Sequence, residues 1–154
     1  MSFRSPFLFL APVPSGWGDP RPYRGGVHEG IDLAVPVGTP VLSIASGTVS
    51  KIVADPCNSA GLYVTVSHDD REFRSLYMHL SRIDVQRGQR VRKGQRLGLS
   101  GRTGGSQRGP GCTFDAGTRD HVHLTVRRIA ARAGRYRGAE HDGFVAVPAE
   151  PFVP

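Results

Sequence analysis

Two short segments of the sequence place histidine beside other groups that can bind a metal. His28 and Asp32 are four residues apart in a glycine-flanked segment, and His121 and His123 form a His-x-His pair in a run of alternating side chains. Side chains two residues apart on a strand point to the same face, so these two imidazoles are expected to lie together. Taken alone, each motif is more often a solvated loop pair or a half-buried histidine pair than a metal site.

The two motifs together supply the donor set of a catalytic zinc site. Zinc in such sites takes three protein ligands, imidazole nitrogen and carboxylate oxygen among them, and keeps a fourth position for water. His28, Asp32 and His123 are such a set, which leaves His121 and His79 as nearby bases. Two histidines and a carboxylate suit zinc better than calcium or magnesium, which prefer oxygen ligands, but ligand type alone does not exclude copper or iron.

The remaining candidates are interpreted as structural. His68 and His141 are expected to be surface histidines. Glu29 follows the first histidine as in a His-Glu-x-x-His zinc motif, but Asp32 stands where the second histidine would be, and no helix is indicated, so that motif is rejected.

The elements that position these groups are predicted to be short strands. Turn residues recur between short apolar runs, and no stretch shows an apolar stripe with a period of 3.6 residues, so the fold class is predicted to be all-β. Two similar segments, Gly38–Val41 and Gly88–Val91, indicate a folded antiparallel sheet or partly open barrel built from two halves. The expected strands are Val41–Ala45, Thr48–Ala54, Leu62–Ser67, Phe73–Leu80, Arg90–Gly101 (with a bend at Gly94) and His121–Arg128.

The whole chain is expected to form a single domain, residues 1–154, since 38% of its residues are hydrophobic and can supply a core. The predicted core covers about residues 15–128. Residues 129–154 are expected to be a C-terminal tail that packs on this core through three aromatic residues, Tyr136, Phe144 and Phe152.

A long loop, Gly101–Arg119, precedes the His-x-His pair and is expected to border the site, because long loops in compact domains are often functional. It contains Cys112, while Cys57 lies in another loop segment. A disulfide between them, which would suit an oxidising compartment, and two free thiols are equally compatible with the sequence. In the chain-entropy description a bridge would contribute about 4 kcal/mol.

The composition restricts the partners. Twenty Lys and Arg against 13 Asp and Glu give a formal charge of +7, which attracts polyanions. The arginines are scattered and not interleaved with aromatic residues, so no nucleic-acid partner is expected, and an anionic cell wall is the alternative. The apolar residues 6–13 are too short and proline-broken to span a membrane and make no clear signal peptide, so an export signal has been trimmed or another route is used. A monomer is expected.

At this point the residues resemble the lysostaphin-like zinc metallopeptidases, whose fold is called a duplicated hybrid motif. The resemblance follows the order of the family's motifs over about residues 15–128. The matching motifs are His28-x-Gly-Ile-Asp32-Leu-Ala, Pro40-Val41 to Gly47-x-Val49, Tyr77-Met78-His79-Leu80-Ser81, Val91-x-Lys93-Gly94-Gln95-x-Leu97-Gly98-x-Ser100-Gly101 and His121-Val122-His123-Leu124.

The resemblance implies that His28, Asp32 and His123 bind zinc, and that His121 and His79 are catalytic histidines flanking the water at the metal. The implied protein is an endopeptidase, extracellular or periplasmic, that hydrolyses peptide bonds in peptidoglycan stems or cross-bridges. The alternative is a non-catalytic cell-wall-binding or regulatory domain of the same fold. A biotin- or lipoyl-carrier domain, suggested by Lys93-Gly94, is set aside because the peptidase motifs already include these residues.

Three departures from the family's pattern remove no ligand. Thr118-Arg119-Asp120 replaces a lead of small residues into the His-x-His pair, the loop before it is longer than usual, and a Gly-x-Arg motif near the N-terminus survives only loosely as Gly18–Arg21. The first two lie where substrate would approach. The sequence therefore leaves open whether the bond cut is Gly–Gly, D-Ala–Gly or D-Ala–diaminopimelate, and whether the wall attacked is the cell's own.

Overall fold

The computed structural model describes residues 2–21, 26–104, 111–114, 117–134, 138 and 140–153. Over this part of the chain every strand pairing is antiparallel, which confirms the all-β prediction. The strands are β1 Pro20–Arg21, β2 Gly26–Val27, β3 Ile31–Ala34, β4 Pro40–Leu42, β5 Gly47–Val53, β6 Leu62–His68, β7 Phe73–Ile83, β8 Arg90–Val91, β9 Arg96–Ser100, β10 His121–Ile129, β11 Glu140–His141 and β12 Phe144–Val147. Two short 3-10 turns, Ala130–Arg132 and Glu150–Phe152, follow β10 and β12.

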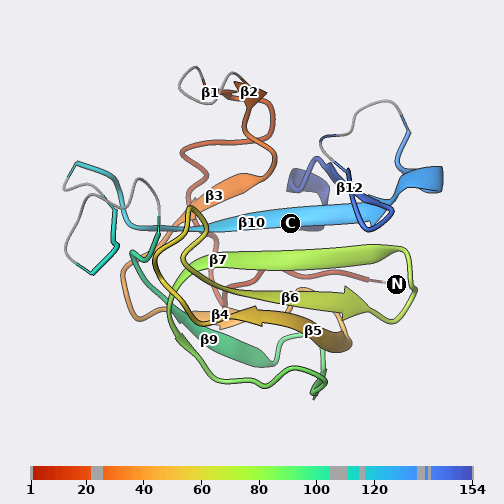
Figure 1. Ribbon diagram of the computed structural model, residues 1–154, viewed down its shortest axis with the longest axis horizontal. Helices are drawn as coiled ribbons and strands as arrows, with labels where there is room; N and C mark the ends of the chain where they lie inside the picture. The colour runs from red at the N-terminus through yellow and green to blue at the C-terminus, as the bar shows by residue number, and fades with distance from the viewer. Residues whose placement is uncertain are drawn as a thin grey trace.

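The main sheet is folded and open. Its strands run in the order β11-β12-β10-β7-β6-β5-β8, and β1 with β2 forms a separate ribbon. β10, β7, β6 and β5 lie side by side down the picture in Figure 1. The far end of β7 leaves this row to pair with β9, which pairs with β4, so the sheet turns back on itself. Among the described residues no pairing joins β11 to β8, and the barrel is therefore not closed, as the sequence predicted.

Alternation along β10 separates the core from the opposite face. Val122, Leu124 and Val126 are completely buried and pack into the hydrophobic core. The residues between them point to the other face of the sheet, because the side chains of a strand alternate. Since burial of apolar area stabilises a fold by roughly 25 cal/mol per Å², the register of β10 is fixed, and its histidines are directed away from the core.

A bulge in β7 changes the direction of one predicted site residue. The register between β6 and β7 shifts between Leu62 and Val64, and His79 has a φ of 65°. A non-glycine residue in this left-handed region costs roughly 1–3 kcal/mol and is kept where the surrounding structure enforces it. The main-chain N–H of His79 donates to the carbonyl of Ala60 at 2.9 Å, outside the sheet ladder. The bulge thus brings the imidazole of His79 to the histidines of β10, with its ring 5.1 Å from that of His121.

His68 is buried, so the prediction that it lies on the surface is wrong. Its side chain is 3% exposed. Nδ1 lies 3.1 Å from the carbonyl oxygen of Ser46, and Nε2 lies 2.8 Å from Oγ of Ser75. These partners lie 22 and 7 residues away in the sequence, so the polar residues next to His68 did not reveal its burial. His141 is exposed, as predicted.

The predicted strands differ from the observed ones in number and at some of their ends. β3 and β12 were not predicted, and neither were the two-residue strands β1, β2 and β11. The predicted strand Arg90–Gly101 is two strands, β8 and β9, separated by a turn at Gly94, where φ is 86°.

The described C-terminal residues pack against the rest of the fold. β12 pairs with β10 from Val126 to Ile129, and Phe152 packs edge-on against Phe3 and Phe73 at centroid distances of 4.8 and 5.1 Å. Tyr136, the third aromatic residue expected in this tail, lies outside the described residues. No helix in the described ranges has the length and apolar character needed to cross a bilayer.

Candidate metal centre and active site

Three predicted ligand atoms converge at one point beside the sheet. Nε2 of His28 lies 2.8 Å from Nδ1 of His123 and 3.2 Å from Oδ1 of Asp32, and Nδ1 of His123 lies 3.0 Å from the same Oδ1. In a tetrahedral zinc site with bonds of about 2.0–2.2 Å, ligand atoms are roughly 3.3 Å apart. The two imidazole nitrogens and the carboxylate oxygen therefore fit a small divalent cation in both chemistry and spacing.

Pairing between β3 and β10 builds this cluster. Asp32 and His123 are directly opposite in the two strands, and His28 precedes β3 by one short turn. Gly30 lets the chain pass close to β10, since a Cβ there would lie 2.5 Å from the carbonyl oxygen of Leu124 and 2.6 Å from Nε2 of His123. A larger residue at position 30 would displace the His123 ring.

The outer nitrogens of the two histidines are held by hydrogen bonds that fix their protonation. Nδ1 of His28 donates to the carbonyl of Gly16 at 3.0 Å. Nε2 of His123 lies 2.8 Å from Oγ1 of Thr125, whose hydroxyl donates to the carbonyl of Glu29 at 3.2 Å. Because that hydroxyl proton is used, Thr125 accepts from His123. In the neutral form, each ring therefore presents an unprotonated nitrogen to the cluster, as metal binding requires.

His79 and His121 lie beside the cluster with a common arrangement. Nδ1 of His79 lies 2.8 Å from the carbonyl oxygen of Thr103, and Nδ1 of His121 lies 2.8 Å from that of Arg119. A carbonyl only accepts, so each Nδ1 carries the proton and each Nε2 is free to accept one when the ring is neutral. Nε2 of His121 is 3.7 Å from Oδ1 of Asp32. Both rings are thus prepared for proton transfer next to the convergent donor atoms.

Burial and mutual charge set the protonation of the cluster. Burial, with smaller contributions from the charges of His123 and His121, lowers the pKa of His79 to about 3. Burial also lowers the pKa of His123, although the interaction with Asp32 opposes it. For Asp32 burial alone would raise the pKa, but hydrogen bonds with His123 and His28 outweigh it and hold the pKa well below its ordinary value. An ionised Asp32 beside a neutral His123 is the state that a cation requires.

Phe114 is a site residue that sequence reasoning missed. Its ring stacks on His121 with a centroid distance of 4.6 Å and an interplanar angle of 12°, and it meets His79 edge-on at 4.7 Å. The side chain is only 4% exposed, and the guanidinium of Arg102 lies 5.2 Å from the ring centre. Phe114 therefore packs against both histidines that are not predicted ligands. Its only signal in the sequence was its place in the long loop before β10.

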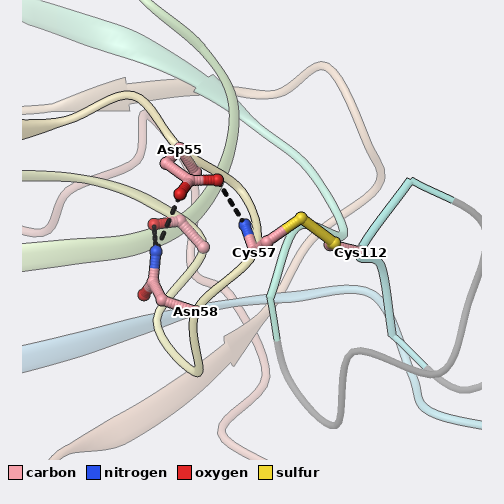
Figure 2. The surroundings of a disulfide bond; sticks show 5 residues. Asp55, Cys57, Asn58 and Cys112 are labelled. Carbon is pink, nitrogen blue, oxygen red and sulfur yellow. Dashed lines mark hydrogen bonds between the residues drawn. A yellow bond between two sulfur atoms is a disulfide. The ribbon is translucent and has the colours of Figure 1, made fainter.

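A disulfide anchors the loop that carries Phe114. Of the two alternatives that the sequence left open for the cysteines, the structure has the disulfide rather than two free thiols. Cys57 and Cys112 are joined with a Cα–Cα distance of 5.0 Å (Figure 2). On the other side of the bridge, Asp55 accepts a hydrogen bond from the main-chain N–H of Cys57 at 2.9 Å. The N–H of Phe114 donates to the carbonyl of Arg102 at 2.8 Å. These links hold the described part of the loop against the β5–β6 connection, next to the catalytic candidates.

The fold and the site together are those of a known class of peptidases. Residues 26–136 match the sequence model of Peptidase family M23, and the chain belongs to this family. This confirms the resemblance to lysostaphin-like enzymes that the motifs indicated.

Relatives and solved structures agree with this assignment. The chain is 42% identical over 103 residues to the peptidoglycan DD-endopeptidase ShyA of Vibrio cholerae, a match that covers 60% of the chain and 23% of ShyA. The catalytic domain of lysostaphin from Staphylococcus simulans superposes with a TM-score of 0.69 at 27% identity and covers 92% of the chain and 91% of that domain. A zinc-containing peptidase from Vibrio cholerae gives a TM-score of 0.65 at 31% identity, over 82% of the chain and 36% of that protein. The chain spans 16–25% of the length of its first curated relatives.

Proposed function

We propose that the protein is a zinc-dependent endopeptidase that hydrolyses peptide bonds in bacterial peptidoglycan. The observation that carries this proposal is the convergence of three donor atoms from β10 and the segment before and within β3, beside two further histidines. The relative ShyA is a peptidoglycan DD-endopeptidase, which supports the substrate class. The structurally similar peptidase from Vibrio cholerae contains zinc, which supports the choice of metal.

In this proposal His28, Asp32 and His123 hold the zinc ion. Two neutral imidazoles and one carboxylate leave one net positive charge on the site, and the spacing of their donor atoms suits tetrahedral bonds. When bound there, zinc supplies Lewis acidity, which acidifies a water molecule and polarises the scissile carbonyl.

His79 and His121 are the proposed acid–base pair. Each has its Nδ1 proton on a main-chain carbonyl and its Nε2 available. One ring accepts a proton from the attacking water at its Nε2. The other ring already uses its Nδ1 proton on a carbonyl, so it donates a hydrogen bond to the oxyanion only as an imidazolium, with a second proton on Nε2. The lowered pKa of His79, about 3, means that this ring is neutral at pH 7, with its Nε2 unprotonated. Phe114 keeps both rings in place by packing against them.

The proposed setting is outside the cytoplasm. The Cys57–Cys112 disulfide suits an oxidising compartment, either the periplasm or the extracellular space, where peptidoglycan lies. The formal charge of +7 would hold the enzyme against an anionic wall, an interaction that must weaken as ionic strength rises. We further propose that residues 1–154 act as one catalytic domain and as a monomer.

The second candidate function is a non-catalytic wall-binding or regulatory domain of the same fold. A domain without catalysis has no need of His79 and His121, yet both are present with their Nδ1 protons fixed. This favours the enzyme.

Elemental analysis combined with a peptidoglycan digest tests the proposal. One equivalent of zinc and the release of new amino groups are expected for the protein. His121→Ala should keep zinc and lose most turnover, whereas His123→Ala should lose both; the exposed His141→Ala is the matched control. Stoichiometric zinc without any cleavage of peptidoglycans from several wall types would favour the non-catalytic domain. Sequencing the fragments by mass identifies the bond that is cut.

A further inference from the structure

The face of the sheet that carries the metal centre continues into a pair of arginines. His123 and Thr125 share this face, as the hydrogen bond between their side chains requires. Arg127 is the next residue of the same parity on β10, and Arg74 stands directly opposite it on β7. At 3.3–3.4 Å per residue, Arg127 lies about 13 Å along the strand from His123. β10 and β7 run side by side over this whole length (Figure 1).

Among the described residues, these two half-buried arginines have no acidic side chain paired with them. Nε of Arg74 and Nε of Arg127 are both buried, and neither forms a hydrogen bond to any of the described residues. Within the part of the chain that the structure describes, neither side chain forms an ion pair. Like charges directly opposite in an antiparallel pair repel each other, and a buried unpaired donor is itself costly. An arrangement of this kind calls for an anion.

The neighbouring Arg128 provides an internal comparison. Its Nε is also buried without a partner, but its side chain points to the other face and its Nη2 donates to Glu72 at 3.1 Å. Within the described part of the chain, the arginine on the face away from the metal centre thus has a carboxylate at hydrogen-bond distance, whereas the pair on the metal face has none. The charges of Glu29 and Asp142 act to raise the pKa of Arg127, but among the described residues neither carboxylate forms an ion pair with Arg127.

The surroundings of the pair shape a recognition site. The ring of Phe144 packs 3.9 Å from the guanidinium carbon of Arg74 and restricts how it can turn. Burial lowers the pKa of Arg127, which means that its charge is poorly solvated and gains from a bound anion. A planar guanidinium group matches a carboxylate with two parallel hydrogen bonds, each roughly twice as strong as a hydrogen bond between neutral groups.

We propose that Arg74 and Arg127 form a subsite for a free carboxylate of the substrate peptide, one that lies several residues from the scissile bond. The inference rests on the proposed function, because peptidoglycan stem peptides offer both a bond to cut and free carboxylates. The pair holds the peptide over this face of β10 and so directs one bond to the metal centre. Inorganic phosphate is also an anion that two arginines could bind, and the experiment below distinguishes it from a peptide carboxylate.

Two peptides of the same sequence, one with free and one with amidated carboxylates, test the subsite with the zinc-loaded protein. For the free peptide, Arg74→Gln and Arg127→Gln should each raise KM about tenfold with kcat within about twofold, since a hydrogen bond to a charged group is lost. For the amidated peptide, the wild-type KM should already be raised and the variants should change it little. Arg127→Lys should recover part of the loss. The exposed Arg87→Gln is the matched control and should behave as wild type. Zinc content and thermal midpoint verify that each variant is folded.

Three results would overturn the subsite. Equal losses on both peptides would make the arginines structural, and unchanged KM values on the free peptide would leave them without a role. Inhibition by inorganic phosphate that depends on Arg74 and Arg127, with no difference between the two peptides, would assign the pair to phosphate. If the wild-type protein cleaves neither peptide nor peptidoglycan, the proposed function fails instead. The subsite is then measured separately, by calorimetric binding of the two peptides to the wild-type protein and to both Gln variants.

Discussion

Thr125 Oγ1 lies 2.8 Å from Nε2 of His123, two residues earlier on the same strand, and joins this ring to the chain that carries His28. The link continues because the hydroxyl of Thr125 donates to the carbonyl of Glu29 at 3.2 Å. The side chain of Thr125 thus fixes which nitrogen of His123 carries the proton, and it also holds the main chain at Glu29, next to His28. Partners of this kind orient metal ligands and raise their basicity.

Thr125→Val should therefore weaken zinc binding while leaving all three predicted ligands in place. Valine keeps the shape of threonine but neither accepts from His123 nor donates to Glu29. The expected loss is about 10- to 100-fold in zinc affinity, measured by competition with a chromogenic chelator. Thr125→Ser keeps the hydroxyl and should retain most of the affinity. Equal affinities for the Val and Ser variants would contradict this role.

Phe114→Leu should lower kcat about tenfold without loss of zinc. The reason is that the rings of His79 and His121 would no longer be held in the exact position that catalysis requires. Leucine preserves the apolar burial but removes the flat surface that stacks on His121 and meets His79 edge-on. Steady-state kinetics with metal analysis provides the measurement. Phe9→Leu, at a ring that is 47% exposed, is the control. A normal kcat for Phe114→Leu would show that packing volume alone is needed.

The three candidate ligands and the two further histidines could be proposed from the sequence, because residue types and their spacing within a motif can be recognised without knowing the fold. Alternation placed His121 and His123 on one face, and the buried residues between them on β10 confirm that period. The direction of His79 could not be predicted in this way. It depends on a positive φ and a bulge, which come from pairing between β6 and β7 rather than from neighbouring residues.

The missed strands have a similar explanation. Ile31–Ala34 and Phe144–Val147 are short, and most of their residues are buried on both faces, so neither shows the alternation that identifies a strand. Both are held by β10, a partner about 90 residues away for the first of them. Phe114 was missed because a loop residue is recognised as part of a site only when its neighbours in space are known.

Removal of the disulfide should destabilise the protein and impair catalysis together. The bridge closes a loop of 55 residues, for which the chain-entropy description gives about 4 kcal/mol. In the double variant Cys57→Ser, Cys112→Ser the free energy of unfolding, measured by denaturant titration, should fall by about 2–4 kcal/mol. Its kcat should fall because Phe114 follows Cys112 by two residues. Reductant should reproduce both effects in the wild-type protein and neither in the variant. Undiminished stability and activity after reduction would show that the loop holds itself.

The buried His68 should make the protein less stable as the pH falls below about 6.5. Burial lowers the pKa of His68 from 6.5, and it outweighs the carbonyl of Ser46 and the charges of Asp70 and Asp69, which raise it. As the pH falls, His68 therefore takes up a proton in the unfolded chain before it does so in the folded protein. The contribution of His68 to stability is complete above its pKa in the unfolded chain and declines as the pH falls towards its pKa in the folded protein.

One such histidine contributes a slope of up to about 1.4 kcal/mol per pH unit. His79 contributes in the same direction, whereas Asp32 titrates only below its unfolded value of 3.8 and does not act in this range. The contribution of His68 is isolated by comparison with His68→Gln, which removes the titrating ring and retains an amide donor for Ser46. Denaturant titrations between pH 7 and pH 5, at about half-unit steps, should give a shallower decline for the variant than for wild type. The exposed His141→Gln should keep the wild-type slope. Parallel slopes for His68→Gln and wild type would mean that His68 is protonated as readily in the folded protein as in the unfolded chain.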